Sequence, residues 1–214
     1  VLTAESGATI ADLIVACTEV QLSGLEHFAG IPSSVGGSMR QNLHFLAPNR
    51  DDTVFIGEIV IESLVLDSNG DVQTVDKDYF AIGYDESILH HNTDVVLGVR
   101  FQLTKSTSSK IEAQIADNLA WRNAKQPQLT DFPSCGSVFK KIEGVGAGRL
   151  IDEAGLKGKK MGGIKVSPLH ANYLINTGNA TAQDVRNMIQ LIQAEVYSQT
   201  GYSLEPEISF VGEE

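Results

Sequence analysis

The sequence predicts an α+β fold in two parts. Strand patterns outweigh helix in its first half, whereas long helical patterns and short strands share its second half. The 214 residues are 42% hydrophobic and 20% charged, which is ordinary for a globular protein with a buried core. The polar connector KSTSSK begins at Lys105. We therefore predict one domain at residues 1–106 and a second at residues 107–214.

The first half begins with an amphipathic helix after Thr9, a residue placed to cap it. Its apolar residues recur at helical spacing: Ile10, Leu13, Ile14 and Cys17. Residues 24–37 are too rich in Gly, Pro and Ser for a regular element, so we expect a structured loop. Two β-branched runs joined by Asn69-Gly70 predict a hairpin, and residues 95–103 alternate like a half-buried strand.

The second half is predicted to contain three helices and three short strands. Ser109 and Glu112 form a capping box for the first helix, and Gly155 ends a short second helix, AGRLIDEAG. GGIKVS, NYLIN and the final LEPEISF have the composition of strands. The third helix spans residues 181–200 and stops at Gly201. The predicted buried stripes are Ile111, Ile115 and Leu119 in the first helix, and Val185, Met188, Ile189, Ile192 and Val196 in the third.

The composition excludes several classes of function. Sixteen basic against 27 acidic residues give a formal net charge of −11, which would repel a nucleic-acid backbone. The two cysteines, Cys17 and Cys135, are too few for a disulfide framework or a zinc site, and no metal is expected. No apolar run approaches the ~20 residues that span a bilayer. We expect a cytoplasmic protein with no membrane or nucleic-acid partner, and a monomer.

The loop AGIPSSVGG has two interpretations. Gly30, Gly36 and Gly37 would let the backbone approach a ligand and present N–H groups to phosphate oxygens. The loop lacks the spacing of either common nucleotide-binding glycine motif. By composition a structural turn is favoured over a phosphate cradle.

Two further stretches could carry proton chemistry. In LEPEISF, Glu205 and Glu207 share one face of the expected strand, where they are either solvated acids or, less commonly, acids lining a cleft. Ser137, in FPSCGSVFKK, lacks the GxSxG context of a nucleophile. Its hydroxyl is either part of a turn, as composition favours, or a proton donor to a strongly basic carbanion or enolate.

Four residues of the second half are candidate ligand contacts. Arg122 and Lys125 end a predicted helix, where basic residues complement the helix dipole but are also able to reach an anionic ligand. In KVSPLHANYLIN, His170 and Asn172 have alternate spacing and could donate to a polar ligand. A lone histidine is more often structural.

In this order, the motifs resemble one family over nearly the whole chain. They are GLEHFAGIPSSVGGSMRQN, GYDESIL, RNAKQP, CGSVFK, AGRLIDEAGLKGKKMGGIKVSPLHANYLIN and LEPEISFVG. This text is similar to that of the UDP-N-acetylenolpyruvoylglucosamine reductases of peptidoglycan synthesis, in the shorter of the family's two types. The resemblance implies the second lobe of a split, PCMH-like FAD-binding domain at residues 1–106 and a small α/β substrate-binding domain at residues 107–214.

The resemblance also implies a reaction and a site. Family members are cytoplasmic flavoproteins in which FAD, reduced by NADPH, delivers a hydride to an enolpyruvyl UDP-sugar and a serine protonates the resulting enolate. The serine corresponds to Ser137, and the glutamate that assists it corresponds to Glu207. Lys125 and His170 correspond to substrate contacts, with Arg122 and Asn172 as weaker candidates. The residues that meet the cofactor correspond to Gly30, Ile31, Pro32, Gly36, Gly37 and Asn42.

Departures from the family pattern leave a second reading open. The family's GYR-x-S arginine is replaced by Asp85, which inverts a charge where a developing anion would lie. Ser209 and Lys141 replace a usual arginine and asparagine, and Lys141 or Arg40 could substitute for the missing cation. The family's N-terminal lobe, with its glycine-rich flavin loop, has no counterpart in this sequence, so we expect either a fragment or a divergent member of the family. The alternative is a non-catalytic relative that binds nucleotide sugar or flavin without turnover.

Overall fold

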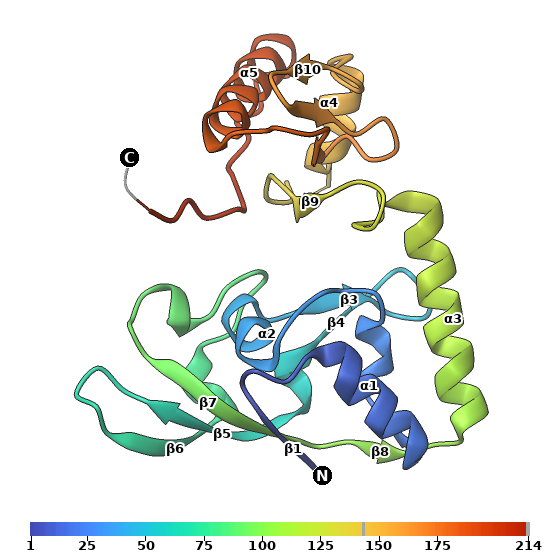
Figure 1. Ribbon diagram of the computed structural model, residues 1–214, viewed down its shortest axis with the longest axis vertical. Coiled ribbons are helices and arrows are strands. Elements are labelled where there is room, and N and C mark those ends of the chain that lie inside the picture. The colour runs from blue at the N-terminus through green and yellow to red at the C-terminus, as the bar shows by residue number, and fades with distance from the viewer. Residues whose placement is uncertain (143, 213–214) are drawn as a thin grey trace. The chain divides into compact units, whose positions relative to one another are not determined.

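The computed structural model describes residues 1–142 and 144–212 (Figure 1). The chain forms two compact units, Val1–Trp121 and Arg122–Glu214. Each unit combines helices with antiparallel strands, and the order of elements along the chain is mixed. The predicted α+β class is therefore confirmed.

The first unit is built on a four-stranded antiparallel sheet in the order β1-β7-β5-β6. These strands are β1 (Leu2–Glu5), β5 (Val60–Leu66), β6 (Val72–Asp76) and β7 (Val95–Phe101). The predicted hairpin is β5–β6, whose last pair is Leu66 with Val72. Gly70 lies in its turn with a φ of 89°, a conformation that glycine adopts without strain.

Two α-helices, α1 and α2, lie between β1 and β3 in the sequence of this unit. The predicted first helix is α1 (Ile10–Glu19), capped by Thr9, which accepts a hydrogen bond from the N–H of Asp12 at 3.1 Å. The loop predicted over residues 24–37 is wrong at its end, because α2 (Val35–Gln41) begins inside it with Ser34 as N-cap. Two glycines in the first turn of α2 hid its helical pattern.

Short strands and 3₁₀ turns complete the first unit. The pair β2–β8 joins Leu22–Ser23 to Thr104–Lys105, and the pair β3–β4 joins His44–Leu46 to Thr53–Phe55. The 3₁₀ turns are η1 (Glu26–Phe28), η2 (Ile56–Ile59), η3 (Lys77–Phe80) and η4 (Ile88–His90).

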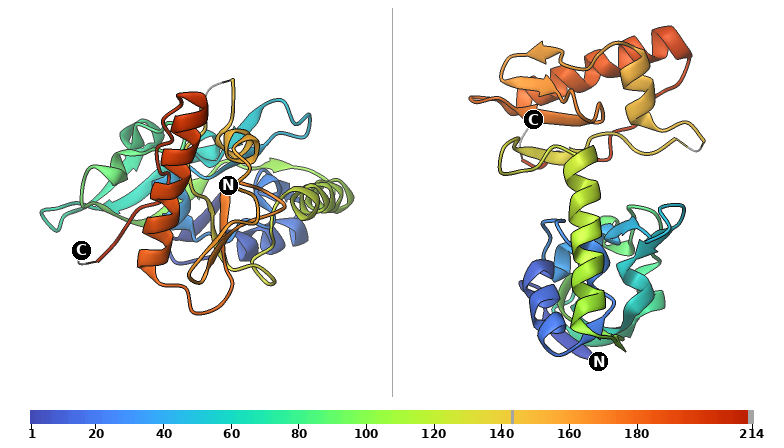
Figure 2. Two further views of the ribbon diagram at one scale, coloured as in Figure 1. Left: turned by 90° about the horizontal axis from the view of Figure 1, so that it is seen from above. Right: turned by 90° about the vertical axis from the view of Figure 1, so that its right-hand side faces the viewer.

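Helix α3 (Ser108–Lys125) runs along the first unit through most of its length (Figure 2). The predicted domain boundary at 106/107 falls at the start of α3, whereas the compact units divide at Trp121 and Arg122, because Ile115 and Trp121 pack on the first core. We predicted that Ser109 caps this helix with Glu112, and this is wrong: α3 begins at Ser108, so Ser109 lies within its first turn. Leu119 is 37% exposed, and the buried position is Asn118 instead.

Residues after Trp121 form a second antiparallel sheet in the order β10-β11-β12-β9, together with two helices. Its strands are β9 (Ser134–Ser137), β10 (Lys160–Met161), β11 (Ile164–Val166) and β12 (Tyr173–Asn176). Helix α4 (Ala147–Glu153) and helix α5 (Ala182–Thr200) contact each other. The α5 prediction is confirmed: Thr181 caps it, Gly201 ends it with a φ of 75°, and its stripe faces the core.

The strand predicted for LEPEISF is wrong. The segment makes one isolated bridge, between Phe139 and Pro206, and is otherwise irregular. Leu204 is buried, but Phe210 is 43% exposed, so the expected apolar face ends early. Pro206 has no N–H to donate, which limits the ladder that this segment can form.

Candidate active site

Ser137 is the last residue of β9 and lies directly opposite Tyr173 in β12. The pairing shifts register between Tyr173 and Ile175, and Gly136 has a φ of 86°, which a residue with a side chain adopts only with strain. This irregular turn of β9 is the local reason why a Gly precedes the serine. Residues at opposed positions of an antiparallel pair project to the same face, so Ser137 and Tyr173 share one.

Asn172 fixes the backbone that follows Ser137. Its side-chain Oδ1 accepts from the N–H of Phe139 at 3.0 Å, and its Nδ2 donates to the carbonyl of Phe139 at 2.9 Å. Its own carbonyl accepts from the N–H of Val138 at 2.9 Å. The residue is buried, so the amide that we predicted to meet substrate is already paired at both ends with the main chain.

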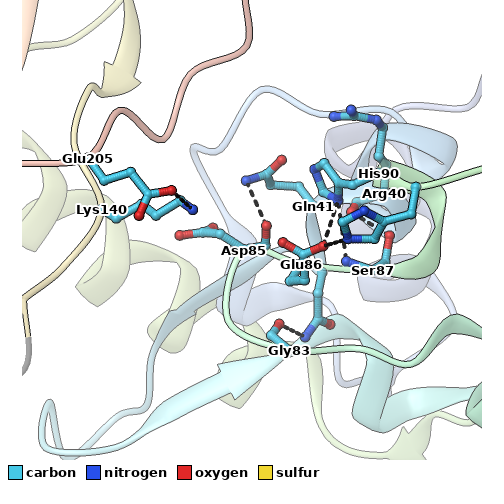
Figure 3. A network of polar contacts seen from close by, with 11 residues as sticks. Arg40, Gln41, Gly83, Asp85, Glu86, Ser87, His90, Lys140 and Glu205 are labelled. Carbon is cyan, nitrogen blue, oxygen red and sulfur yellow. Dashed lines mark hydrogen bonds and ion pairs between the residues drawn. The ribbon is translucent and has the colours of Figure 1, made fainter.

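The segment around Glu207 lies against the other edge of residues 138–140. The N–H of Glu207 donates to the carbonyl of Val138 at 2.8 Å, and the N–H of Lys140 donates to the carbonyl of Glu205 at 2.9 Å. The exposed side chains of Lys140 and Glu205 form an ion pair, which is drawn in Figure 3. Glu207 is half-buried, whereas Glu205 is exposed.

The pKa of the Tyr173 phenol is influenced by both predicted catalytic residues, Ser137 and Glu207. Burial raises the pKa of its phenol, the positive charge of Arg122 lowers it, a hydrogen bond with the Ser137 side chain lowers it, and the negative charge of Glu207 raises it. The Ser137 hydroxyl and the charges of Arg122 and Glu207 therefore all act on this phenol. The sequence pattern did not single out Tyr173, although a tyrosine in an apolar strand usually needs a partner for its hydroxyl.

The two basic candidates at the end of α3 differ in environment. Burial lowers the pKa of Arg122, partly offset by the neighbouring Tyr173, and the guanidinium stays charged because its ordinary pKa is far above neutrality. Lys125 is exposed at the last position of the helix. Arg122 thus supplies a fixed positive charge near Tyr173, and Lys125 a solvated one.

His170 is held by its neighbours in one orientation. Its Nδ1 accepts a hydrogen bond from the N–H of Asn172 at 3.2 Å, and its ring lies 4.8 Å from that of Tyr173. Burial lowers the pKa of the imidazole, and the charge of Lys157 lowers it further. The neutral ring therefore carries its proton on Nε2, which makes that nitrogen a hydrogen-bond donor.

The glycine-rich loop of the first unit uses its donors internally. The N–H groups of Val35 and Gly36 donate to the carbonyls of Ala8 and Ser6, each at 2.9 Å, and the N–H of Gly37 donates to the Ser34 hydroxyl. A Cβ on Gly36 would lie 3.2 Å from the Cβ of Ser6. Close packing, and not an anion, explains glycine at position 36, and these donors do not fit a phosphate cradle.

The other predicted cofactor residues have structural contacts. Ile31 is half-buried against the core and Pro32 is exposed, while Gly30 has a φ of 82°. Asn42 ends α2 in the left-handed conformation with a φ of 44°. Its side chain accepts from the N–H of Gly57 at 3.2 Å and donates to the carbonyl of Gly83 at 2.8 Å. Asn42 therefore anchors the loop that carries Asp85.

Asp85 lies in a turn with a φ of 54° (Figure 3). Gln41 donates to its carbonyl at 3.5 Å, and the next turn is anchored by Ser87, whose hydroxyl donates to the carbonyl of Arg40 at 2.6 Å. The carboxylate is 8% exposed and lies 3.5 Å from Nδ1 of His44. The acid at the family's arginine position is thus directed toward a histidine.

The replacement cations considered from the sequence are both at the surface. Arg40 is exposed in the last turn of α2, and Lys141 is exposed after Lys140. Ser209 is exposed near the end of the described chain. Among residues 1–142 and 144–212, no three metal-ligating side chains gather in one place. Within the same ranges, no helix has the length and apolar character needed to cross a bilayer.

Comparison with known proteins identifies relatives over the entire chain. Residues 126–211 match the family model described as the C-terminal domain of UDP-N-acetylenolpyruvoylglucosamine reductase. UDP-N-acetylenolpyruvoylglucosamine reductase 2 of Bacillus cereus is 37% identical over 213 residues, which is 100% of this chain and 67% of that protein. The reductase of Pediococcus pentosaceus is 38% identical, over 99% of this chain and 68% of that protein. The chain therefore spans about two thirds of these relatives.

A solved structure has the same fold. The crystal structure of UDP-N-acetylenolpyruvylglucosamine reductase from Thermus caldophilus superposes with a TM-score of 0.83 at 28% sequence identity. The match covers 97% of this chain and 71% of that one.

Proposed function

Because the chain belongs to the UDP-N-acetylenolpyruvoylglucosamine reductase family, we propose that it reduces UDP-N-acetylglucosamine enolpyruvate to UDP-N-acetylmuramate in peptidoglycan synthesis. The observation that carries this proposal is the pairing of Ser137 with Tyr173 next to the backbone contact between Glu207 and Val138, with the charges of Arg122 and Glu207 both acting on the Tyr173 phenol. A donor, a carboxylate and a fixed cation in one place suit the protonation of an anionic intermediate.

In this proposal Ser137 donates the proton. Addition of a hydride to the enolpyruvyl double bond leaves an enolate next to a carboxylate. The Oγ–H bond of Ser137 breaks, and a new C–H bond forms at the enolate carbon. A hydroxyl is a weak acid, so it serves only when it is held in line with a strongly basic acceptor. The clamp of Asn172 on Phe139 and the pairing of β9 with β12 supply that fixed position.

Other residues of the second unit have supporting roles in the proposal. Glu207 stabilises or helps to protonate the enol form, and its half-buried position suits a carboxylate that faces a ligand. Arg122, Lys125 and the Nε2–H of His170 contact the anionic UDP-sugar, since all three are donors and two are cations. Asn172 acts through the backbone it holds, because substrate contact by its amide would break two buried hydrogen bonds.

The cofactors FAD and NADPH remain part of the proposal on the strength of the family resemblance. Reduced FAD supplies the hydride when it is bound, and NADPH reduces it. The N–H groups of Val35, Gly36 and Gly37 do not fit the diphosphate of FAD, since each already has an acceptor. We therefore assign no phosphate contact to the loop from Gly30 to Gly37.

One observation favours a second candidate, a relative that binds the sugar without reducing it. Asp85 stands where the family has an arginine, and among the described residues its Oδ2 is a buried oxygen with no hydrogen-bond partner. A carboxylate at that position would repel a developing anion instead of stabilising it. Loss of turnover with retained sugar binding is the behaviour this candidate predicts.

Absorption spectroscopy of the purified protein tests the proposal. A reductase gives flavin bands that NADPH bleaches and that the enolpyruvyl sugar restores. A colourless preparation that binds the sugar supports the second candidate. A preparation whose flavin bands stay bleached after NADPH, whatever the concentration of the enolpyruvyl sugar, contradicts the proposed reaction.

A further inference from the structure

We propose that Arg186 and Phe210 are positioning residues for Glu207: their contact anchors the end of the C-terminal segment, residues 204–210, and so holds the glutamate in place. The inference rests on the proposed function, in which Glu207 assists the proton donor Ser137. Neither Arg186 nor Phe210 was among the site residues predicted from the sequence.

The C-terminal segment is irregular, so contacts of single residues hold it in place. It makes one isolated bridge, through Pro206, and belongs to no strand. Before Glu207, the carbonyl of Leu204 accepts a hydrogen bond from Nε2 of Gln193 at 2.8 Å, and the Leu204 side chain is buried. Ordering a backbone costs conformational entropy at every residue, which contacts must offset. The residues that follow Glu207 therefore need an anchor of their own.

Phe210 supplies this second anchor through its ring. The guanidinium carbon of Arg186 lies 4.2 Å from the centroid of that ring, within the range of about 6 Å for a cation–π contact. Arg186 belongs to α5 and is half-buried. Of the two residues between Glu207 and Phe210, Ile208 packs against the core of the second unit and Ser209 is exposed. The cation–π contact therefore fastens the segment to α5 on the far side of Glu207.

Both anchors of the segment come from one face of α5. Arg186 and Gln193 lie two turns apart in this helix, which places them on the same side and about 10 Å apart along its axis. The six residues from 204 to 210 would reach about 20 Å if fully extended. The segment is thus longer than the distance between its anchors, and it depends on both to fix its course. Glu207 lies at its middle, where its N–H donates to the carbonyl of Val138 at 2.8 Å.

Loss of the Arg186 contact leaves Glu207 held from one side only. The bond from its N–H to the carbonyl of Val138 then lies at the end of the ordered part of the segment, where hydrogen bonds open more readily. In the proposed reaction the Glu207 carboxylate acts on the enol form of the substrate and takes no part in the reduction of flavin by NADPH. A displaced carboxylate therefore slows product formation and leaves flavin reduction unchanged.

Single-turnover kinetics of matched variants test the contact. Arg186→Gln, which removes the cation, should lower the rate of product formation by about 5-fold and leave flavin reduction unchanged. Arg186→Lys keeps a cation near the ring and should restore most of that rate. Phe210→Leu, at an exposed side chain, should show the same loss as Arg186→Gln. Arg149→Gln is the control and leaves both rates unchanged, because Arg149 is exposed and pairs with Glu153 in α4.

Hydrogen exchange tests the same contact without turnover. The N–H of Glu207 should exchange about 5-fold faster in Arg186→Gln and Phe210→Leu than in the unmodified protein or in Arg149→Gln. Normal product formation by both variants, together with a loss in Glu207→Gln, would overturn the inference alone. A loss in Arg186→Lys equal to that in Arg186→Gln would also overturn it, because the charge would then not matter. Normal product formation by Glu207→Gln would instead refute the proposed function of Glu207.

Discussion

Replacing Asn172 by alanine separates a structural role from a substrate contact. The change removes the two hydrogen bonds to Phe139 and leaves its N–H and carbonyl buried without partners. Each unsatisfied buried group costs about 1–3 kcal/mol, and two groups lose their partner here. Because water gains some access to them in the variant, the free energy of unfolding of the second unit should fall by about 3 kcal/mol. The carbonyl of Asn172, which accepts from Val138, is retained in the variant.

Urea denaturation followed by far-ultraviolet circular dichroism measures this loss, and hydrogen exchange assigns it to the second unit. Asn176→Ala is the matched control, because Asn176 ends β12, the strand that follows Asn172, but is exposed and accepts a side-chain hydrogen bond from the N–H of Gly178. Its substitution should cost less than about 1 kcal/mol. A stable Asn172→Ala protein that no longer binds the UDP-sugar would refute the reasoning and restore Asn172 as a substrate contact.

Three further predictions each follow from the surroundings of one residue. A hydrogen bond to Asp94 raises the pKa of Tyr79 from 10.0 to about 12. The unfolded state therefore loses this proton at a lower pH than the folded state, so the free energy of unfolding falls between about pH 10 and about pH 12. Tyr79→Phe should make that fall smaller, as measured by urea midpoints over a series of pH values. Burial lowers the pKa of His170 below 6.5, so the free energy of unfolding falls as pH drops through 6.5. His170→Gln should reduce the dependence of the urea midpoint on pH in this range, and an unchanged dependence would contradict the burial argument. Gly163→Ala should cost about 3 kcal/mol or more, measured by thermal unfolding, because its Cβ would lie 2.5 Å from the backbone of Ala180.

Long amphipathic patterns were sufficient to predict several elements of the fold. The stripe of α5 and the cap of α1 are local properties, since each depends on residues within a few positions of one another. The sequence failed where tertiary contacts override local preference. Asn118 is buried in α3 because its Nδ2 donates to the carbonyl of His27 and its Oδ1 accepts from Arg50, and no local pattern reveals those partners.

The candidate site was predictable only in part for the same reason. The resemblance supplied Ser137 and Glu207, and neither spacing nor composition would have favoured them over a turn residue and a solvated acid. Tyr173 was hidden because its role depends on the register between β9 and β12, which are separated by 35 residues, from Ser137 to Tyr173. The internal use of the N–H groups of Val35 and Gly36, in the first turn of α2, was likewise not predictable without the backbone contacts to Ala8 and Ser6.

Single-turnover kinetics of Ser137→Ala test the central claim most directly. NADPH first reduces the flavin, and the enolpyruvyl sugar then reoxidises it, so the two half-reactions are recorded separately by absorbance. The account predicts flavin reduction at nearly the normal rate and a loss of ~10² or more in product formation, in line with the usual contribution of a general acid, while Ser134→Ala behaves as the unmodified protein. Normal product formation by Ser137→Ala would contradict the assignment of the proton donor.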